Sequence, residues 1–282
     1  MTIMFWPVVI FMAISLAIGL YTYTQVRGSS QRYTVCGKSM PFLVVGTALA
    51  AQAIDGNSTL GNTSLTYSSG MTVVCFIILV AGNLSAVAWI LSVVAGISYG
   101  TALVIATAII FTYTIAGGLY AAIWTDFFQI HVAIIGFVAA CVYTLLNHPV
   151  DLSGFRNVAG LTEIKSGALS NWASIISLGF GNAMALDFME RVFSARTPET
   201  ARRACYYAGG WTIVTGFCAT VLGLAALQLI PKVEDPRMVL PMFATGQLPY
   251  VIGVMVFVGV VGASMSTANG AMLVIAVVMA RN

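Results

Sequence analysis

Long apolar runs separated by short polar connections dominate the chain. An α-helix rises about 1.5 Å per residue, so about 20 apolar residues span a hydrocarbon core of about 30 Å. The pattern predicts about eight membrane-crossing helices, the second of them interrupted by polar residues. These segments cover residues 4–23, 41–67, 72–94, 101–120, 127–146, 171–189, 208–230 and 251–280.

The second segment is interrupted near its middle by QAIDGNSTLG, residues 52–61. In a helix that starts at Pro41, Gln52 lies about 16 Å and Asp55 about 21 Å along the axis, deep within the hydrocarbon core. A carboxylate at that depth is costly and indicates a functional site. Gly56, followed by two residues that favour helix N-termini, predicts that one helix ends and another begins. Irregular backbone at this depth is tolerated only where it is buried in protein or lines a cavity, so we predict a broken helix that builds an ion or small-solute site.

Composition excludes most soluble functions. Hydrophobic residues make up 59% of the chain and charged residues 7%, against about 25% charged residues in a typical soluble domain. We therefore predict an all-α polytopic membrane protein. The two histidines are isolated and the five cysteines lack paired spacing, so neither a metal cluster nor a cofactor is expected. Catalytic motifs and extended basic patches are absent from the sequence, which argues against an enzyme and against nucleic-acid binding.

Positive charge is concentrated in two connections. Residues 27–38 carry three basic and no acidic side chains, and residues 190–203 carry four arginines and two glutamates. The positive-inside rule places both connections in the cytoplasm. Five predicted spans separate them, however, which would put them on opposite sides. Either one connection violates the charge rule, or one segment does not cross, or a crossing is missing.

Four motifs occur in one order along the chain. They are QAIDGNSTLGN at 52–62, Gly117-Gly118-Leu119 followed by Trp124-Thr125-Asp126 and Gln129, LDFMERVFSA at 186–195, and GASMSTA at 262–268. The first resembles a broken first helix, the second a GG-x(n)-TD-x-x-Q signature, the third a helix leading into an R-F-x-A loop, and the fourth an A-x-M-S-T-A helix. Together they resemble the sodium:solute symporter family, which includes sodium-coupled proline, pantothenate and sugar transporters. The resemblance extends over nearly all of residues 1–282.

This resemblance implies a partial LeuT-type inverted-repeat fold, in which broken helices at the membrane midplane hold substrate and sodium. It implies a single transmembrane symporter domain over residues 1–282, lying in the lipid bilayer of the cytoplasmic membrane. The implied function is sodium-coupled symport of a small organic solute, with Na⁺ as the coupling ion. The polar groups near the break suit sugars, amino acids and organic acids equally.

The sodium site implied by the resemblance joins two places in the chain. Its ligands would be the backbone carbonyls of Ala53, Gly56 and Ala263 and the hydroxyls of Ser266 and Thr267. Sodium is a hard cation that takes several oxygen ligands, and a helix break frees carbonyl oxygens for that purpose. The three residues of the later segment are spaced i, i+3 and i+4, so they share one helix face. The two hydroxyls could instead bond back to the preceding turn.

Six further polar residues are candidates for the solute cavity. They are Gln52, Asp55, Asn57, Ser58, Asn83 and Asn182. The alternative for Asp55 is an N-cap of the second half-helix, and the alternative for the amides is a polar contact between helices. Two other acidic residues are expected outside the site. Asp126 with Thr125 should cap a helix start at the cytoplasmic side, and Asp187 should form an interfacial ion pair beside Arg191.

Two parts of the family pattern are absent from the sequence. Family members have another helix and a cytoplasmic loop after the broken helix, whereas here Tyr67-Ser68-Ser69-Gly70 leads almost directly into the next apolar segment. One missing crossing there would place both basic connections in the cytoplasm. Family members also continue beyond the segment that ends here at Asn282. We therefore expect an incomplete symporter. The alternatives are a symporter-like sensing module of a membrane sensor kinase and a fragment that does not transport.

Overall fold

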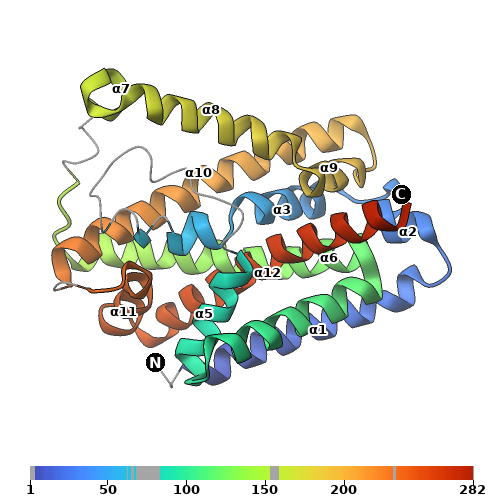
Figure 1. Ribbon diagram of the computed structural model, residues 1–282, viewed down its shortest axis with the longest axis horizontal. Helices are drawn as coiled ribbons and strands as arrows, with labels where there is room; N and C mark the ends of the chain where they lie inside the picture. The colour runs from blue at the N-terminus through green and yellow to red at the C-terminus, as the bar shows by residue number, and fades with distance from the viewer. Residues whose placement is uncertain are drawn as a thin grey trace.

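The computed structural model describes residues 4–61, 63–64, 67, 83–152, 159–230 and 233–281. This part of the chain is helical, and its β-structure is limited to an isolated bridge between Met40 and Ala195. Most of its longer helices run roughly along one direction (Figure 1). Among the described helices, four are long and apolar enough to cross a membrane: α1 (Phe5–Val26), α6 (Tyr99–Asn147), α10 (Pro198–Leu229) and α12 (Tyr250–Arg281). The predicted all-α polytopic class is confirmed.

Shorter helices connect these four. They are α2 (Ser30–Val35), η2 (Cys36–Lys38), α3 (Phe42–Ala53), η3 (Asn57–Gly61), α5 (Asn83–Ala95), α7 (Ala159–Thr162), η7 (Ile164–Ser166), α8 (Ala168–Met184), α9 (Leu186–Phe193), η8 (Pro236–Met238) and α11 (Val239–Gly246). The span predicted at 171–189 is divided, because Ala185 is extended (φ −63°, ψ 131°) between α8 and α9. The connection predicted at 231–247 contains η8 and α11.

Helix α10 begins at Pro198, well before the predicted boundary at Ala208. The side chain of Thr197 accepts a hydrogen bond from the backbone N–H of Thr200, and proline occupies the first helical turn. Both features favour a helix start. Glu199 in the same turn pairs with the two arginines that follow it one turn later. Part of the second basic connection is therefore the first turns of a helix.

The predicted break in the second segment is present. Helix α3 ends at Ala53, Ile54 leaves the helical conformation (φ −93°, ψ 86°), and a π-helical turn follows at Asn57–Gly61. The next described helix, α5, runs from Asn83 to Ala95. The helix expected to be missing near Gly70 falls outside the described residues.

Helix α6 turns back on itself at Gly118, where φ is 55° and ψ is −140°. One straight helix of its 49 residues would be about 74 Å long, more than twice the hydrocarbon thickness. The amide of Asn269 lies 3.3 Å from the hydroxyl of Tyr113 and 3.5 Å from the carboxylate of Asp126, although these residues are on opposite sides of Gly118. The two spans predicted at 101–120 and 127–146 are therefore two arms of α6. The stretch predicted between them is helical apart from the turn.

The second arm of α6 packs closely against α12. A Cβ added at Gly259 would lie 2.8 Å from the Cα of Ala133, and one added at Gly136 would lie 2.7 Å from the carbonyl oxygen of Met255. Small residues at such contacts let helix backbones approach, which strengthens packing in the absence of a hydrophobic driving force. These contacts fix the position of the GASMSTA segment of α12 inside the molecule, where residues 262–268 are all buried.

The two basic connections lie at the same end of the molecule. The backbone N–H of Met40 donates to the carbonyl of Ser194, and that of Arg196 donates to the carbonyl of Met40, both at 3.1 Å. Figure 1 shows α2, α9 and the C-terminal end of α12 together at this end, opposite the start of α1. The number of crossings between the two connections is therefore even, as the charge rule requires. We refer to this end as the basic end.

Candidate functional site

The break after α3 frees one backbone carbonyl near the middle of the molecule. In a continuous helix the carbonyl of Ala51 would accept from the N–H of Asp55. That N–H instead donates to Ser58 Oγ at 2.7 Å. The carbonyl of Ala50, one residue earlier, still accepts from the N–H of Ile54. The break therefore leaves the Ala51 oxygen available to groups outside the helix.

Two hydroxyls of α12 meet this freed carbonyl. Ser266 Oγ and Thr267 Oγ1 each lie 3.4 Å from the Ala51 oxygen, and Thr267 Oγ1 lies 3.4 Å from the Ala263 oxygen. All four residues are buried. The structure thus joins the broken helix to the predicted face of the GASMSTA segment. Sequence reasoning missed Ala51, because the position of the break was known only to within a turn.

The three contacts are long hydrogen bonds donated by the hydroxyls, and the bond from Thr267 to the Ala263 carbonyl is the expected alternative, a bond back to the preceding turn. Hydroxyl hydrogen bonds are usually about 2.7 to 2.8 Å long, shorter than the 3.4 Å found here. Oxygens held at about 2.4 Å from a hard cation in octahedral geometry lie about 3.4 Å from one another. Neutral carbonyl and hydroxyl oxygens are the ligands that a hard monovalent cation takes. The donor set therefore fits sodium.

Ala53 and Gly56 flank this cluster along the chain. Ala53 is the last residue of α3, and Gly56 is buried at the start of the next helical turn. Both stay predicted ligands. The carbonyl that the structure brings within 3.4 Å of the α12 hydroxyls is that of Ala51.

Three of the solute-cavity candidates, Gln52, Asp55 and Ser58, have hydrogen-bond partners at the break. Gln52 Nε2 donates to the carbonyl and the hydroxyl of Ser266, both at 3.2 Å. Asp55 is buried and its Oδ1 accepts from the N–H of Ser58 at 2.7 Å, while Ser58 Oγ accepts from the N–H of Asp55. This reciprocal pair is a helix N-cap, the structural alternative for Asp55. Asp55 and Ser58 therefore hold the second half-helix in place beside the cluster.

Three other candidates are located only by their backbone. Asn57 begins η3, Asn83 begins α5 and Asn182 lies in the last turn of α8. Their side chains fall outside what the structure describes. Helix α8 packs on α7 and α9 along one edge of the molecule (Figure 1).

A buried ion pair lies next to the break. Arg191 on α9 donates to Asp126 Oδ2 from Nη2 at 2.8 Å and from Nε at 3.0 Å, and neither side chain has exposed surface. The expectation that Asp126 caps a helix start is wrong. Asp126 lies within the second arm of α6, and the Thr125 hydroxyl bonds back to the preceding turn. The expected pairing of Asp187 is also wrong, since Arg191 uses only the main-chain carbonyl of Asp187.

The ion pair and the oxygen cluster are adjacent. A Cβ added at Gly270 of α12 would lie 2.8 Å from Gln52 Oε1 and 3.0 Å from Arg191 Nη1. The missing side chain lets Gln52 and Arg191 approach α12 at one point. Sequence reasoning missed Arg191 and Asn269 as parts of this region. A signal for this pairing was available in the sequence. Asp126 and Arg191 each belong to a motif and each place a charge at membrane depth, where charged side chains pair with one another.

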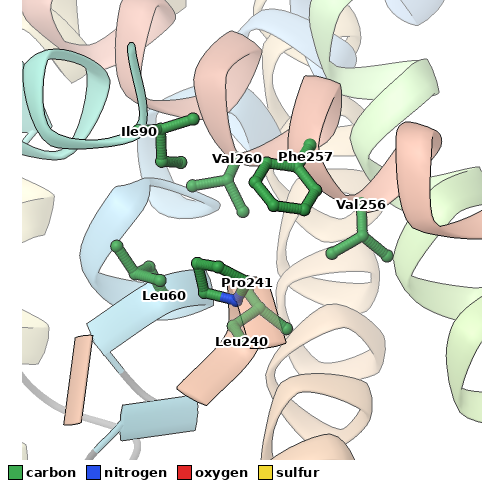
Figure 2. A pocket seen from close by; sticks show the side chains of 7 residues that line it. All are labelled: Leu60, Ile90, Leu240, Pro241, Val256, Phe257 and Val260. Carbon is green, nitrogen blue, oxygen red and sulfur yellow. The ribbon is translucent and has the colours of Figure 1, made fainter. Parts of the chain in front are cut away.

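A separate gap lies beside α12, between it and the helices η3, α5 and α11. Figure 2 shows that only apolar side chains surround it, among them Leu60, Ile90 and Phe257. Its volume is about 10 Å³. A cavity of this size without polar partners holds neither a water molecule nor a solute. It is a packing defect near the second half-helix.

Comparisons with known proteins agree with this geometry. The model of the sodium:solute symporter family matches residues 71–281. A high-affinity choline transporter of Drosophila melanogaster is 25% identical over 217 residues, 72% of this chain and 35% of that protein. A sodium/proline symporter of Staphylococcus aureus is 25% identical over 191 residues, 64% of this chain and 36% of that protein. The chain thus matches about a third of the length of these curated relatives.

A solved structure shows the same fold. It is the substrate-bound, outward-open state of a Na⁺-coupled sialic acid symporter, with a TM-score of 0.74 at 16% identity. The superposition covers 95% of this chain and 71% of that one. The predicted LeuT-type architecture is confirmed in the part that the two share. Since the family model matches well over half of its residues, the chain belongs to the sodium:solute symporter family.

Proposed function

We propose that the chain functions in sodium-coupled symport of a small organic solute across the cytoplasmic membrane. The observation that carries the proposal is the meeting of the freed Ala51 carbonyl with Ser266 Oγ and Thr267 Oγ1 at 3.4 Å. A broken helix that presents carbonyls to hydroxyls of a second helix is the arrangement by which LeuT-type transporters hold sodium. Ala53, Gly56 and Ala263 complete the proposed ligand set around the same point.

The residues of the site would link ion binding to the arrangement of two helices. The ligands come from α3 on one side and α12 on the other, so a bound cation draws the two helices together. A ligand shifts a conformational equilibrium by its differential affinity for the two states. Sodium would therefore favour the state in which the break in α3 and the hydroxyls of α12 are closest. The capped Asp55–Ser58 turn keeps the second half-helix in register during this change.

The solute would bind next to the break. Gln52 is half-buried, and its Oε1 makes no hydrogen bond within the described part of the chain. That oxygen is a free acceptor at the edge of the oxygen cluster. Named relatives transport choline and proline, and the structural neighbour takes sialic acid. These three are the solutes to be tried first.

Sodium binding by the purified chain tests the proposal directly. We expect saturable binding of ²²Na⁺ that potassium does not displace. Ser266→Ala combined with Thr267→Ala should weaken sodium binding at least about tenfold, because two of the cluster's oxygens are lost. Uptake of proline, choline and sialic acid into proteoliposomes under an inward sodium gradient then tests for transport.

Ser264→Ala is the matched control for these substitutions. Ser264 is buried on the same helix, and its hydroxyl makes no hydrogen bond within the described residues. Its loss should leave sodium binding unchanged. If the double variant binds sodium as the unsubstituted chain does, the assignment of the site is wrong.

A further inference from the structure

A hollow of about 470 Å³ opens at the basic end, where α1, α2 and the first arm of α6 meet. One wall is the turn between α1 and α2, with Arg27, Ser29 and Ser30, and Tyr33 follows on α2. The other wall is apolar and includes Ile115 and Ala116 of α6. The lining of the hollow shares no residue with the oxygen cluster. Its walls therefore combine a charged, hydroxyl-bearing surface with a hydrocarbon surface.

The glycine pair of the GG-x(n)-TD-x-x-Q motif shapes this junction. A Cβ added at Gly118 would lie 2.6 Å from the carbonyl oxygen of Tyr33 and 2.7 Å from its ring. The turn at Gly118 therefore lets Tyr33 pack against the end of the first α6 arm, beside the hollow. This contact half-buries the Tyr33 side chain, and burial raises the pKa of the phenol, which stays a hydrogen-bond donor at neutral pH.

The charged side chain in the wall of the hollow is that of Arg27. The sequence contains no acidic residue before Asp55, and in the described part of the chain no acidic side chain pairs with Arg27. The second basic connection, with Arg196, lies at the same end. Arg27 is exposed at the mouth of the hollow, so its guanidinium is free to bind an anion. Guanidinium and hydroxyl groups together suit a phosphate.

The apolar wall decides which phosphate fits. Ile115 is 54% exposed and Tyr23 50% exposed, and both line the hollow. A free phosphate would use only the polar wall, whereas a phospholipid would place its headgroup on Arg27 and its acyl chains along Ile115. Basic residues next to the cytoplasmic end of a membrane helix attract anionic lipids. We propose that this hollow binds the headgroup of one anionic phospholipid of the cytoplasmic leaflet.

Native mass spectrometry of the full chain in detergent tests the proposal, with dioleoylphosphatidylglycerol as the probe. We expect one phosphatidylglycerol per chain to be retained, in preference to phosphatidylcholine. Arg27→Gln should weaken retention about five- to tenfold. Ala116→Phe should weaken it to a similar extent without any change of charge, because the new ring fills the hollow. Arg27 is exposed, so Arg27→Gln is expected to fold even if Ala116→Phe does not.

Two control variants separate a site from general surface attraction. Lys38→Gln removes an exposed charge from the same basic segment outside the hollow, and Val104→Phe adds a ring on the exposed face of α6. Both should retain the lipid. Equal loss in Arg27→Gln and Lys38→Gln, with Ala116→Phe unaffected, would overturn the proposal in favour of diffuse attraction. Displacement of the lipid by millimolar glycerol phosphate would overturn the lipid assignment in favour of a soluble anion.

Discussion

Arg191 and Asp126 form the most costly contact that the structure describes, since both charges are removed from water. Breaking a buried pair by removing one partner leaves an uncompensated charge. We therefore expect Arg191→Ala to destabilise the chain by about 3 to 5 kcal/mol. The measurement is the midpoint of denaturant-induced unfolding in detergent.

The combined variant Asp126→Asn with Arg191→Met separates loss of the pair from loss of packing. Without a lone charge, it should recover a large part of the lost stability. Arg202→Ala, which removes an exposed partner of Glu199, is the control and should leave the midpoint unchanged. If the combined variant is as unstable as Arg191→Ala, the instability does not come from an unpaired charge.

At the scale of elements, the turn within α6 depends on a single backbone conformation. Gly118 has φ 55° and ψ −140°, which side-chain-bearing residues rarely adopt, and a Cβ there would collide with Tyr33. Gly118→Ala should therefore destabilise the chain by at least about 1 to 3 kcal/mol. Gly100→Ala is the matched control, because nothing lies within 4 Å of its added Cβ. Thermal unfolding in detergent compares the two; similar melting temperatures would contradict this account of the turn.

Some helices could be predicted from the sequence, and others could not, because their sequence patterns differ in how clearly they mark a helix. Apolar runs bounded by polar residues predicted α1 and α12, because burial in lipid dictates both length and composition. The break near Asp55 was predictable, because a carboxylate followed by a glycine and N-capping residues is unusual at membrane depth. The early start of α10 was missed because an arginine-rich segment is typical of a loop. Thr197 as N-cap and Pro198 in the first turn nevertheless favour a helix start there.

Contacts between residues far apart in the chain were harder to predict from the sequence. The oxygen cluster was expected from motif resemblance, but the carbonyl that meets Ser266 is set by how far the last turn of α3 unwinds. That depends on the Asp55–Ser58 hydrogen bonds, which compete with the helical bond to Ala51. Asp126 was misassigned because its partner lies 65 residues away on α9, and a local pattern contains no information about such a partner.

At the scale of the whole molecule, charge is distributed between two ends. The basic connections at 27–38 and 190–203 meet through the backbone contacts between Met40 and the segment after α9. Helix α10 then runs about 48 Å along its 32 residues to the opposite end, where Glu234 and Asp235 lie. Because both connections lie at one end, the positive-inside rule predicts that both face the cytoplasm.

Labelling with a membrane-impermeant maleimide tests this orientation. Gln31→Cys and Arg196→Cys are exposed positions on the two basic connections, and Glu234→Cys is exposed at the opposite end. The first two should react in inside-out vesicles and the third in right-side-out vesicles, because the reagent reaches only the outer face of each vesicle. The unsubstituted chain gives the background labelling of its own cysteines, of which Cys205 is exposed while Cys36, Cys141 and Cys218 are buried.

Reaction of Gln31→Cys and Arg196→Cys from different sides would mean that the two connections are not neighbours. Reaction of both from outside would instead reverse the orientation while keeping the fold, so the two failures are distinct. In the second case the anionic-lipid hollow beside Arg27 would face the outer leaflet, and the charge rule, rather than the packing of α3 against α12, would be the step that failed.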